Sequence, residues 1–250
     1  MVTVSGRSGK VILVTGANKG IGKEIVRQLA QPGDVVLLGS RDRERGGRAA
    51  DDLQASGDTI RPVVLDVTKP QVVDTAAASV LKEFGRLDVL INNAGMNIEV
   101  AALDTTANHV REVFEANVYG VVTTIQAFLP LLQRSDAPRI VNVASTTASF
   151  ARMTEPDSLY AKADNILAYA SSKAAVNMLT VQYALAFQRD PKFSHVKINS
   201  VTPGYVATEL NGFSGPRTVE QGAQIVVKLA RIGDDGPTGG FFNDDGAVPW

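Results

Sequence analysis

Cysteine is absent from this chain of 250 residues, and histidine occurs only twice, as His109 and His195. Without cysteine the protein has no disulfides, no thiol nucleophile and no thiolate ligands for zinc or an iron–sulfur cluster. Two histidines are too few for a histidine-rich metal cluster, so we expect no metal site and structural roles for both. The chemistry must then come from Ser, Tyr, Lys, Asn and carboxylate side chains, or from a bound cofactor.

An excess of charge and a long hydrophobic run are also lacking. Lys and Arg number 25 and Asp and Glu number 26, for a net charge of -1, so we expect no nucleic-acid or membrane partner. The longest apolar stretch, residues 118–132, contains polar residues and Pro130 and is too short to span a bilayer. Residues 1–9 hold no apolar core of a secretory signal. Together these absences predict a cytoplasmic protein.

Short β-branched runs alternate with helical stretches along the whole chain. The runs are nearly continuous in apolar residues, which is typical of parallel strands covered on both faces. They occupy residues 10–15, 34–38, 61–65, 87–91, 139–143 and 196–201, and a short final strand is expected near residues 240–242. The pattern predicts one α/β domain over residues 1–250, with a doubly wound parallel sheet of about seven strands and helices on both faces.

Apolar stripes at helical spacing indicate the helices between these strands. The stripes comprise Ile21, Ile25, Val26 and Leu29; Val110, Val113, Phe114, Val118 and Val121; and Ala174, Met178, Leu179 and Tyr183.

The first strand runs directly into a glycine-rich loop, TGANKGIG, at residues 15–22. Its glycines allow a tight turn, and the following helix offers free N–H groups and a positive dipole end to a pyrophosphate. The loop therefore predicts a dinucleotide site. Its cofactor-binding residues would be Gly16, Asn18, Lys19, Gly20, Ile21 and Gly22.

The end of the second strand distinguishes between dinucleotides. An NAD site would carry Asp or Glu there to hold the ribose 2′-OH, whereas this chain has Arg41, followed by Asp42. Arg41 can pair with a 2′-phosphate and Lys19 can assist it. We therefore expect NADPH/NADP+ rather than NAD(H), with a solvated surface charge as the alternative role for Arg41.

Further motifs follow the later strands in a characteristic order. They are Asp66 and Val67; Asn93, Ala94 and Gly95; Asn117; Ser145; Tyr169 and Lys173; and Pro203, Gly204, Val206 and Thr208. From about residue 10 to the end, the chain resembles the short-chain dehydrogenase/reductase family, and within it the NADPH-dependent carbonyl reductases. The resemblance implies a Rossmann-type fold, with all of these residues except Asn117 and Ser145 contacting the cofactor.

The resemblance also implies a catalytic set of Asn117, Ser145, Tyr169 and Lys173. Tyr169 and Lys173 are four apart, so they share one helix face, and a nearby ammonium is expected to lower the phenol pKa. Tyr169 would then exchange a proton with the substrate oxygen, which Ser145 holds. Lys173 would also bind ribose hydroxyls, and Asn117 would hold a water next to Lys173.

Several neighbours compete for these roles. Tyr160 has Asp164, not a lysine, four residues later, which argues against it as the proton donor. Thr146, Thr147 and Ser149 compete with Ser145, which we prefer because it directly follows a predicted strand. Asn117 could instead only cap or kink its helix.

Two segments are candidates for the substrate region. Ser145 and Tyr169 are farther apart than in many family members, and the insertion lies at about residues 150–165. We expect it beside the substrate mouth, although a loop without a role is the alternative. Residues 205–217 form a candidate mobile substrate loop. The candidate substrate residues are Met96, Phe150, Met153, Tyr205 and Phe213.

The sequence therefore predicts reduction of a small ketone or aldehyde by NADPH, with Tyr169 as proton donor. Alternatives are an alcohol dehydrogenase working in the oxidative direction with NAD(P)+, and a non-catalytic dinucleotide-binding regulator. A homo-oligomer is possible, but the insertion puts the tetramer common in the family in doubt.

Overall fold

The computed structural model describes residues 9–53 and 60–250. Residues 1–8, which make up most of the segment compared above with a secretory signal, lie outside the described residues. The described strands form one sheet in the order β3-β2-β1-β4-β5-β6-β7-β8. They are β1 (Val11–Val14), β2 (Val35–Ser40), β3 (Ile60–Val64), β4 (Val89–Asn92), β5 (Arg139–Val143), β6 (Lys197–Val201), β7 (Phe241–Asn243) and β8 (Gly246–Ala247).

The strand pairings confirm the predicted parallel sheet. Every pairing from β3 to β7 is parallel, and the last strand, β8, pairs antiparallel with β7. The expected strand near residues 240–242 is β7. Strand β8 was not anticipated because a strand of two residues, Gly246 and Ala247, carries no hydrophobic run.

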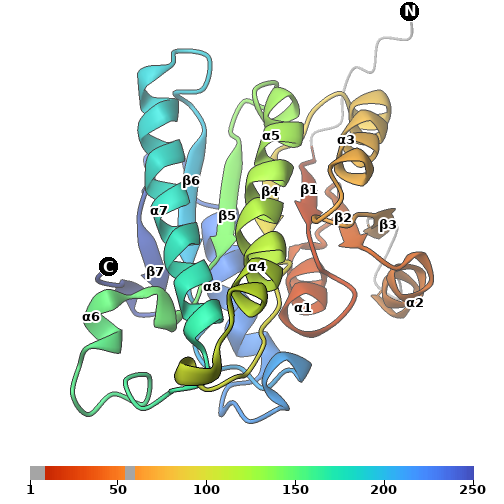
Figure 1. Ribbon diagram of the computed structural model, residues 1–250. Coiled ribbons are helices and arrows are strands. Elements are labelled where there is room, and N and C mark those ends of the chain that lie inside the picture. Colours follow the sequence, from red (N-terminus) through yellow and green to blue (C-terminus); the bar gives the residue numbers. More distant parts are fainter. Residues whose placement is uncertain (1–8, 54–59) are drawn as a thin grey trace, which may run out of the picture.

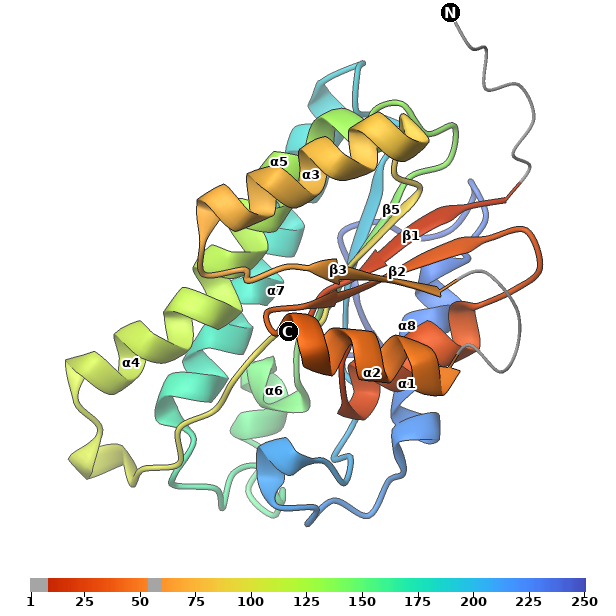
Figure 2. The same cartoon turned by 90° about the vertical axis from the view of Figure 1, so that its right-hand side faces the viewer.

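Helices cover both faces of the sheet, as Figures 1 and 2 show. One face carries α3 (Pro70–Phe84), α4 (Ala107–Phe114), α5 (Gly120–Leu132) and α7 (Leu167–Arg189). The other carries α1 (Gly20–Leu29), α2 (Arg43–Leu53) and α8 (Val219–Ala230). Each layer of helices packs against its own apolar core, and the sheet separates the two cores. The fold is thus the expected single-domain, Rossmann-like α/β arrangement.

The buried face of α7 differs from the apolar stripe predicted for it. Met178 of that stripe is 59% exposed, and Ala174, Leu179 and Tyr183 are only partly buried. The face turned to the core instead carries Ala168, Ser172, Lys173, Val176, Asn177, Thr180, Ala184 and Phe187. Hydrophobic spacing could not identify this face because half of these eight residues are polar.

The parallel strands all point their carboxyl ends toward one edge of the sheet. Strands β1 and β4 are neighbours there, although their helices lie on opposite faces, and the backbone N–H of Thr15 donates to the Ile91 carbonyl at 3.0 Å. Such a change of winding direction opens a crevice at the carboxyl ends of the strands. Within the described residues, no helix is long and apolar enough to cross a membrane.

Candidate active site

The glycine loop is closed tightly against the segment after β4. Gly16 has φ of +62°, and a Cβ on it would lie 2.8 Å from the Ala94 Cα. A Cβ on Gly22 would lie 2.5 Å from the side-chain nitrogen, Nδ2, of Asn93. That nitrogen donates to the Thr15 and Gly16 carbonyls at 3.0 and 3.1 Å. Asn93 therefore holds the loop in a shape that brings bare backbone to the N-terminus of α1, as a bound phosphate requires.

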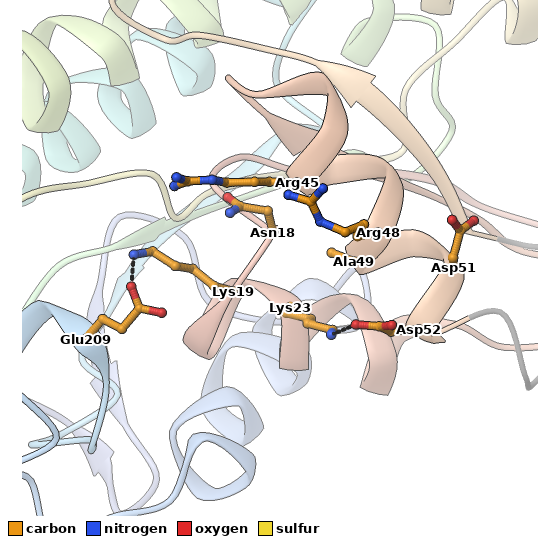
Figure 3. A pocket seen from close by; sticks show the side chains of 9 residues that line it. All are labelled: Asn18, Lys19, Lys23, Arg45, Arg48, Ala49, Asp51, Asp52 and Glu209. Atoms are coloured by element: carbon orange, nitrogen blue, oxygen red, sulfur yellow. Dashed lines mark hydrogen bonds and ion pairs between the residues drawn. The ribbon is translucent and has the colours of Figure 1, made fainter.

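A hollow of about 700 Å³ lies between this loop and α2 (Figure 3). Its lining in the described chain includes Lys19, Arg45 and Arg48, but not Arg41. Arg41 lies before the start of α2. Arg45 lies in the first turn of α2, where its backbone N–H donates to the Asp42 carboxylate at 2.9 Å. The start of α2 thus brings later arginines to the hollow, and a contact between Arg41 and a 2′-phosphate stays a prediction.

Lys19 already has a partner in this hollow. Its ammonium forms an ion pair with Glu209, which lies in a 3-10 turn, Glu209–Asn211, of the predicted substrate loop (Figure 3). Both side chains are about half exposed. The glycine loop and the substrate loop are thereby joined through one charge pair.

A second cavity, of about 490 Å³, lies at the carboxyl ends of the strands. It brings together ten of the predicted catalytic and cofactor-binding residues: Ile21, Asn93, Gly95, Ser145, Tyr169, Lys173, Pro203, Gly204, Val206 and Thr208. These residues come from widely separated parts of the chain, so the fold assembles the set as the motif order suggested.

Ser145, Tyr169 and Lys173 form the polar centre of this cavity. Ser145 and Tyr169 both line the cavity. The Lys173 ammonium donates to the Val143 carbonyl at 2.8 Å and lies 5.7 Å from the centroid of the Tyr169 ring. Burial raises the pKa of Tyr169 above its usual value, and the hydrogen bond from Ser145 opposes that rise. The expected lowering of this pKa by Lys173 is therefore not found.

Burial also lowers the pKa of Lys173 to about 8. The Lys173 side chain is buried because α7 packs directly on the sheet, and the Val143 carbonyl is its hydrogen-bond acceptor. An ammonium held at this depth near a phenol can stabilise the phenolate electrostatically.

Asn117 lies in a π-helical turn, Glu115–Tyr119, that joins α4 to α5. Its Oδ1 accepts the Met96 N–H at 2.8 Å, and its Nδ2 donates to the Met96 carbonyl and the Ser172 hydroxyl, both at 2.9 Å. Such turns often occur at functional sites. Here the turn aims the amide at the segment after β4, and the role of Asn117 with a water stays a prediction.

Asp66 and Val67 follow β3, as predicted, and both are engaged locally. The Asp66 carboxylate accepts the N–H and hydroxyl of Thr68 at 3.0 and 2.7 Å. Val67 is buried, and a Cβ on Gly120 would lie 2.7 Å from its Cγ2. Their contact with adenine stays a prediction.

The structure places only one of the predicted substrate residues in the cavity, and the substrate contacts themselves stay predictions. Of the five, all within the described part of the chain, Tyr205 alone lines the cavity, whereas Met96, Phe150, Met153 and Phe213 do not. Phe150 and Phe213 are 73% and 64% exposed. The lining from the insertion comes instead from its second half, as Leu159, Tyr160, Lys162, Ala163 and Asn165. No motif in the sequence marks where the insertion folds back onto the cavity, and its lining residues are not predominantly aromatic or Met.

The insertion is tied down at both ends. At its start, α6 (Phe150–Met153) meets the end of the chain, where the Ala151 N–H donates to the Trp250 carbonyl at 3.1 Å. At its close, the Val100 and Ala102 N–H groups donate to the carbonyls of Asn165 and Asp164 at 3.2 and 2.8 Å. Between these two anchors, the second half of the insertion forms one wall of the cavity, and its contact with a substrate stays a prediction.

A family model described as short chain dehydrogenase matches residues 10–218. The chain belongs to the short-chain dehydrogenase family. It is 35% identical to short-chain dehydrogenase/reductase 1 of Saponaria officinalis, with 95% of each sequence covered. Among solved structures it is similar to salutaridine reductase from Papaver somniferum (29% identity, TM-score 0.80, 94% and 99% covered). It is also similar to an NADPH-bound carbonyl reductase from chicken fatty liver (27%, 0.83, 97% and 99%).

Membership makes this short-chain dehydrogenase an oxidoreductase acting on CH–OH or C=O groups. The family resemblance expected from the motifs is confirmed.

Proposed function

We propose that this short-chain dehydrogenase reduces a ketone or aldehyde to the alcohol with NADPH, and that Tyr169 donates the proton. One observation carries the proposal: Ser145, Tyr169 and Lys173 line a single cavity that also reaches the glycine-loop residue Ile21 and Thr208. A cavity of about 490 Å³ suits a small-molecule substrate.

The state of Tyr169 supports reduction over oxidation. Because burial raises its pKa, Tyr169 is protonated at neutral pH and can serve as the acid. Alcohol oxidation would require the phenolate as base, which burial disfavours. Lys173, with a pKa of about 8, is largely charged at pH 7 and stabilises the phenolate that remains after proton transfer.

The polar residues at the centre of the cavity have separate roles in this reaction. Bound NADPH supplies the hydride. The Ser145 hydroxyl holds the carbonyl oxygen, and Tyr169 delivers the proton to the same atom as negative charge develops on it. Asn117 and Asn93 keep the segment after β4 against the glycine loop and α7, which preserves the cavity.

The shape and charge of the first hollow support NADPH. The N-terminus of α1 and the bare glycine backbone fit a pyrophosphate, and Lys19, Arg45 and Arg48 fit a further phosphate. A similar carbonyl reductase is described as NADPH-bound. Tighter binding of NADH than of NADPH would instead favour NAD-dependent alcohol oxidation.

Tyr169→Phe tests the proposal directly. It should reduce NADPH consumption over a panel of ketones, aldehydes and quinones by at least about a hundredfold, as expected for loss of a general acid. Its NADPH affinity, measured by fluorescence titration, should stay within about twofold of wild type, because the phenol hydroxyl is a small part of the cofactor contact surface.

Tyr183→Phe is the matched control, since Tyr183 is on the same helix and packs against Phe187, outside the cavity. It should retain wild-type turnover. Turnover that survives in Tyr169→Phe would overturn the mechanism, and NADPH binding without turnover of any carbonyl would favour a dinucleotide-binding regulator.

A further inference from the structure

The hydroxyl oxygen of Ser145 receives two hydrogen bonds from one residue. The Thr147 backbone N–H donates to it at 3.2 Å, and the Thr147 hydroxyl donates at 2.9 Å. The backbone bond is the ordinary cap that a serine provides at the start of a short helical turn, here Thr146–Ala148. The hydroxyl bond depends on the side chain at position 147.

Thr147 is held firmly in this position from both sides. The hydroxyls of Thr146 and Thr202 are hydrogen-bonded at 2.8 Å, which ties the turn to the end of β6. Ser149 is fully buried, and its hydroxyl donates to the Pro249 carbonyl at 2.6 Å. The turn that presents Thr147 to Ser145 is thus anchored to two segments far away in the sequence.

These two bonds use the full capacity of the Ser145 hydroxyl to accept hydrogen bonds. A hydroxyl oxygen has two acceptor positions and one hydrogen to donate. Thr147 occupies both acceptor positions of Ser145, so Ser145 can act only as a donor. Tyr169, which lines the same cavity, cannot then give its own hydrogen to Ser145.

We propose that Thr147 is a positioning residue that makes Ser145 a hydrogen-bond donor to the substrate carbonyl and leaves the Tyr169 proton available for transfer. Two O–H groups then point at one developing oxyanion, which is the arrangement that stabilises such charge. This inference rests on the proposed function. Without the Thr147 hydroxyl, Tyr169 would donate to Ser145 in the ground state and would have to break that bond before reaction.

The test compares Thr147→Val, which keeps the branched shape but removes the hydroxyl, with Thr147→Ser, which keeps the hydroxyl. We expect Thr147→Val to lower kcat about three- to tenfold, the range of one hydrogen bond, with unchanged KM. Thr147→Ser should restore most of kcat. Thr75→Val, at an exposed site on α3, is the matched control and should behave as wild type.

Two further measurements separate this role from a structural one. In a Ser145→Ala background, Thr147→Val should cause no additional loss, because Thr147 acts through Ser145. In an ultraviolet titration referenced to Tyr169→Phe, Thr147→Val should raise the Tyr169 pKa, since the neutral phenol gains an acceptor. The titration requires no substrate, so it decides the inference even where turnover is not observed.

Unchanged kcat and unchanged Tyr169 titration in Thr147→Val would overturn the inference, as would a loss that Thr147→Ser does not restore. Those results leave the proposed function intact if Tyr169→Phe is inactive. Conversely, a wild-type protein that consumes no NADPH with any carbonyl contradicts the proposed function, while the titration still reports on Thr147.

Discussion

Lys173 is a charged side chain that is buried beside Ser145 and Tyr169, and its burial lowers the stability of the fold. Lys173 is 5% exposed, and burial lowers its pKa to about 8 from 10.5. Its hydrogen bond to Val143 offsets only part of the desolvation, so the folded protein is less stable for keeping an ammonium there. Residues kept at such a cost to stability are typical of active sites.

Lys173→Met should therefore stabilise the fold while abolishing turnover. The change in pKa corresponds to at most about 3 kcal/mol, and loss of the bond to Val143 reduces the expected gain to about 1–2 kcal/mol. The gain should be largest below pH 8. Above it the gain should shrink as pH rises toward 10.5, because the wild-type lysine then loses its proton in the folded state first.

Urea unfolding of both proteins at pH 7 and pH 10 measures this difference. Lys82→Met, on the exposed side of α3, is the matched control for loss of a lysine. A Lys173→Met protein that is less stable than wild type at pH 7 would show that the ammonium contributes to the fold.

An ion pair joins the glycine loop to the predicted substrate loop, which lies far from it in the sequence. Lys19 is the N-cap residue of α1, and its partner Glu209 belongs to the predicted substrate loop after β6 (Figure 3). Lys19 is also one of the cations that would face a cofactor phosphate. The same charge cannot serve both partners fully, so we expect cofactor binding to compete with the ion pair to the substrate loop.

Glu209→Gln should therefore strengthen NADPH binding. Because the pair is about half exposed, the expected effect is about two- to fivefold in Kd, and it should decline at high salt. NADH lacks the 2′-phosphate, so its Kd should change less. Fluorescence titration of both cofactors, with Glu155→Gln on the exposed insertion as control, measures the difference. Equal changes for the two cofactors would contradict the competition.

The arrangement of the whole molecule decides where the chemistry occurs. Helices on both faces bury the sheet, so its carboxyl edge is where loops of several strands meet (Figures 1 and 2). The insertion closes one side of this edge and docks on the chain end at Trp250, which stacks on Phe241 with ring centroids 5.7 Å apart. The segments that close the cavity therefore also pack against the core of the fold.

Cofactor binding should accordingly stabilise the entire fold. At concentrations far above Kd, NADPH should raise Tm by roughly 5–10 °C, as mass action predicts for a ligand of the folded state. NADH at the same concentration should raise Tm less. Lys19→Met should reduce the difference between the cofactors, and a larger shift with NADH would contradict the assignment of Lys19 and the arginines of α2.

The sequence by itself determined the sheet, the glycine loop and the Tyr169–Lys173 pair. These features depend on local spacing: β-branched runs form strands, and residues four apart share a helix face. Local spacing did not identify the core face of α7, which is half polar because it carries Ser172, Lys173, Asn177 and Thr180.

Only the tertiary structure decided which distant segments meet. It brought Arg45 and Arg48 rather than Arg41 to the charged hollow, and turned the second half of the insertion into the cavity wall. It also placed the Thr147 hydroxyl on Ser145. Such contacts depend on helix starts, loop paths and packing between residues far apart in the chain, and no spacing in the sequence encodes them.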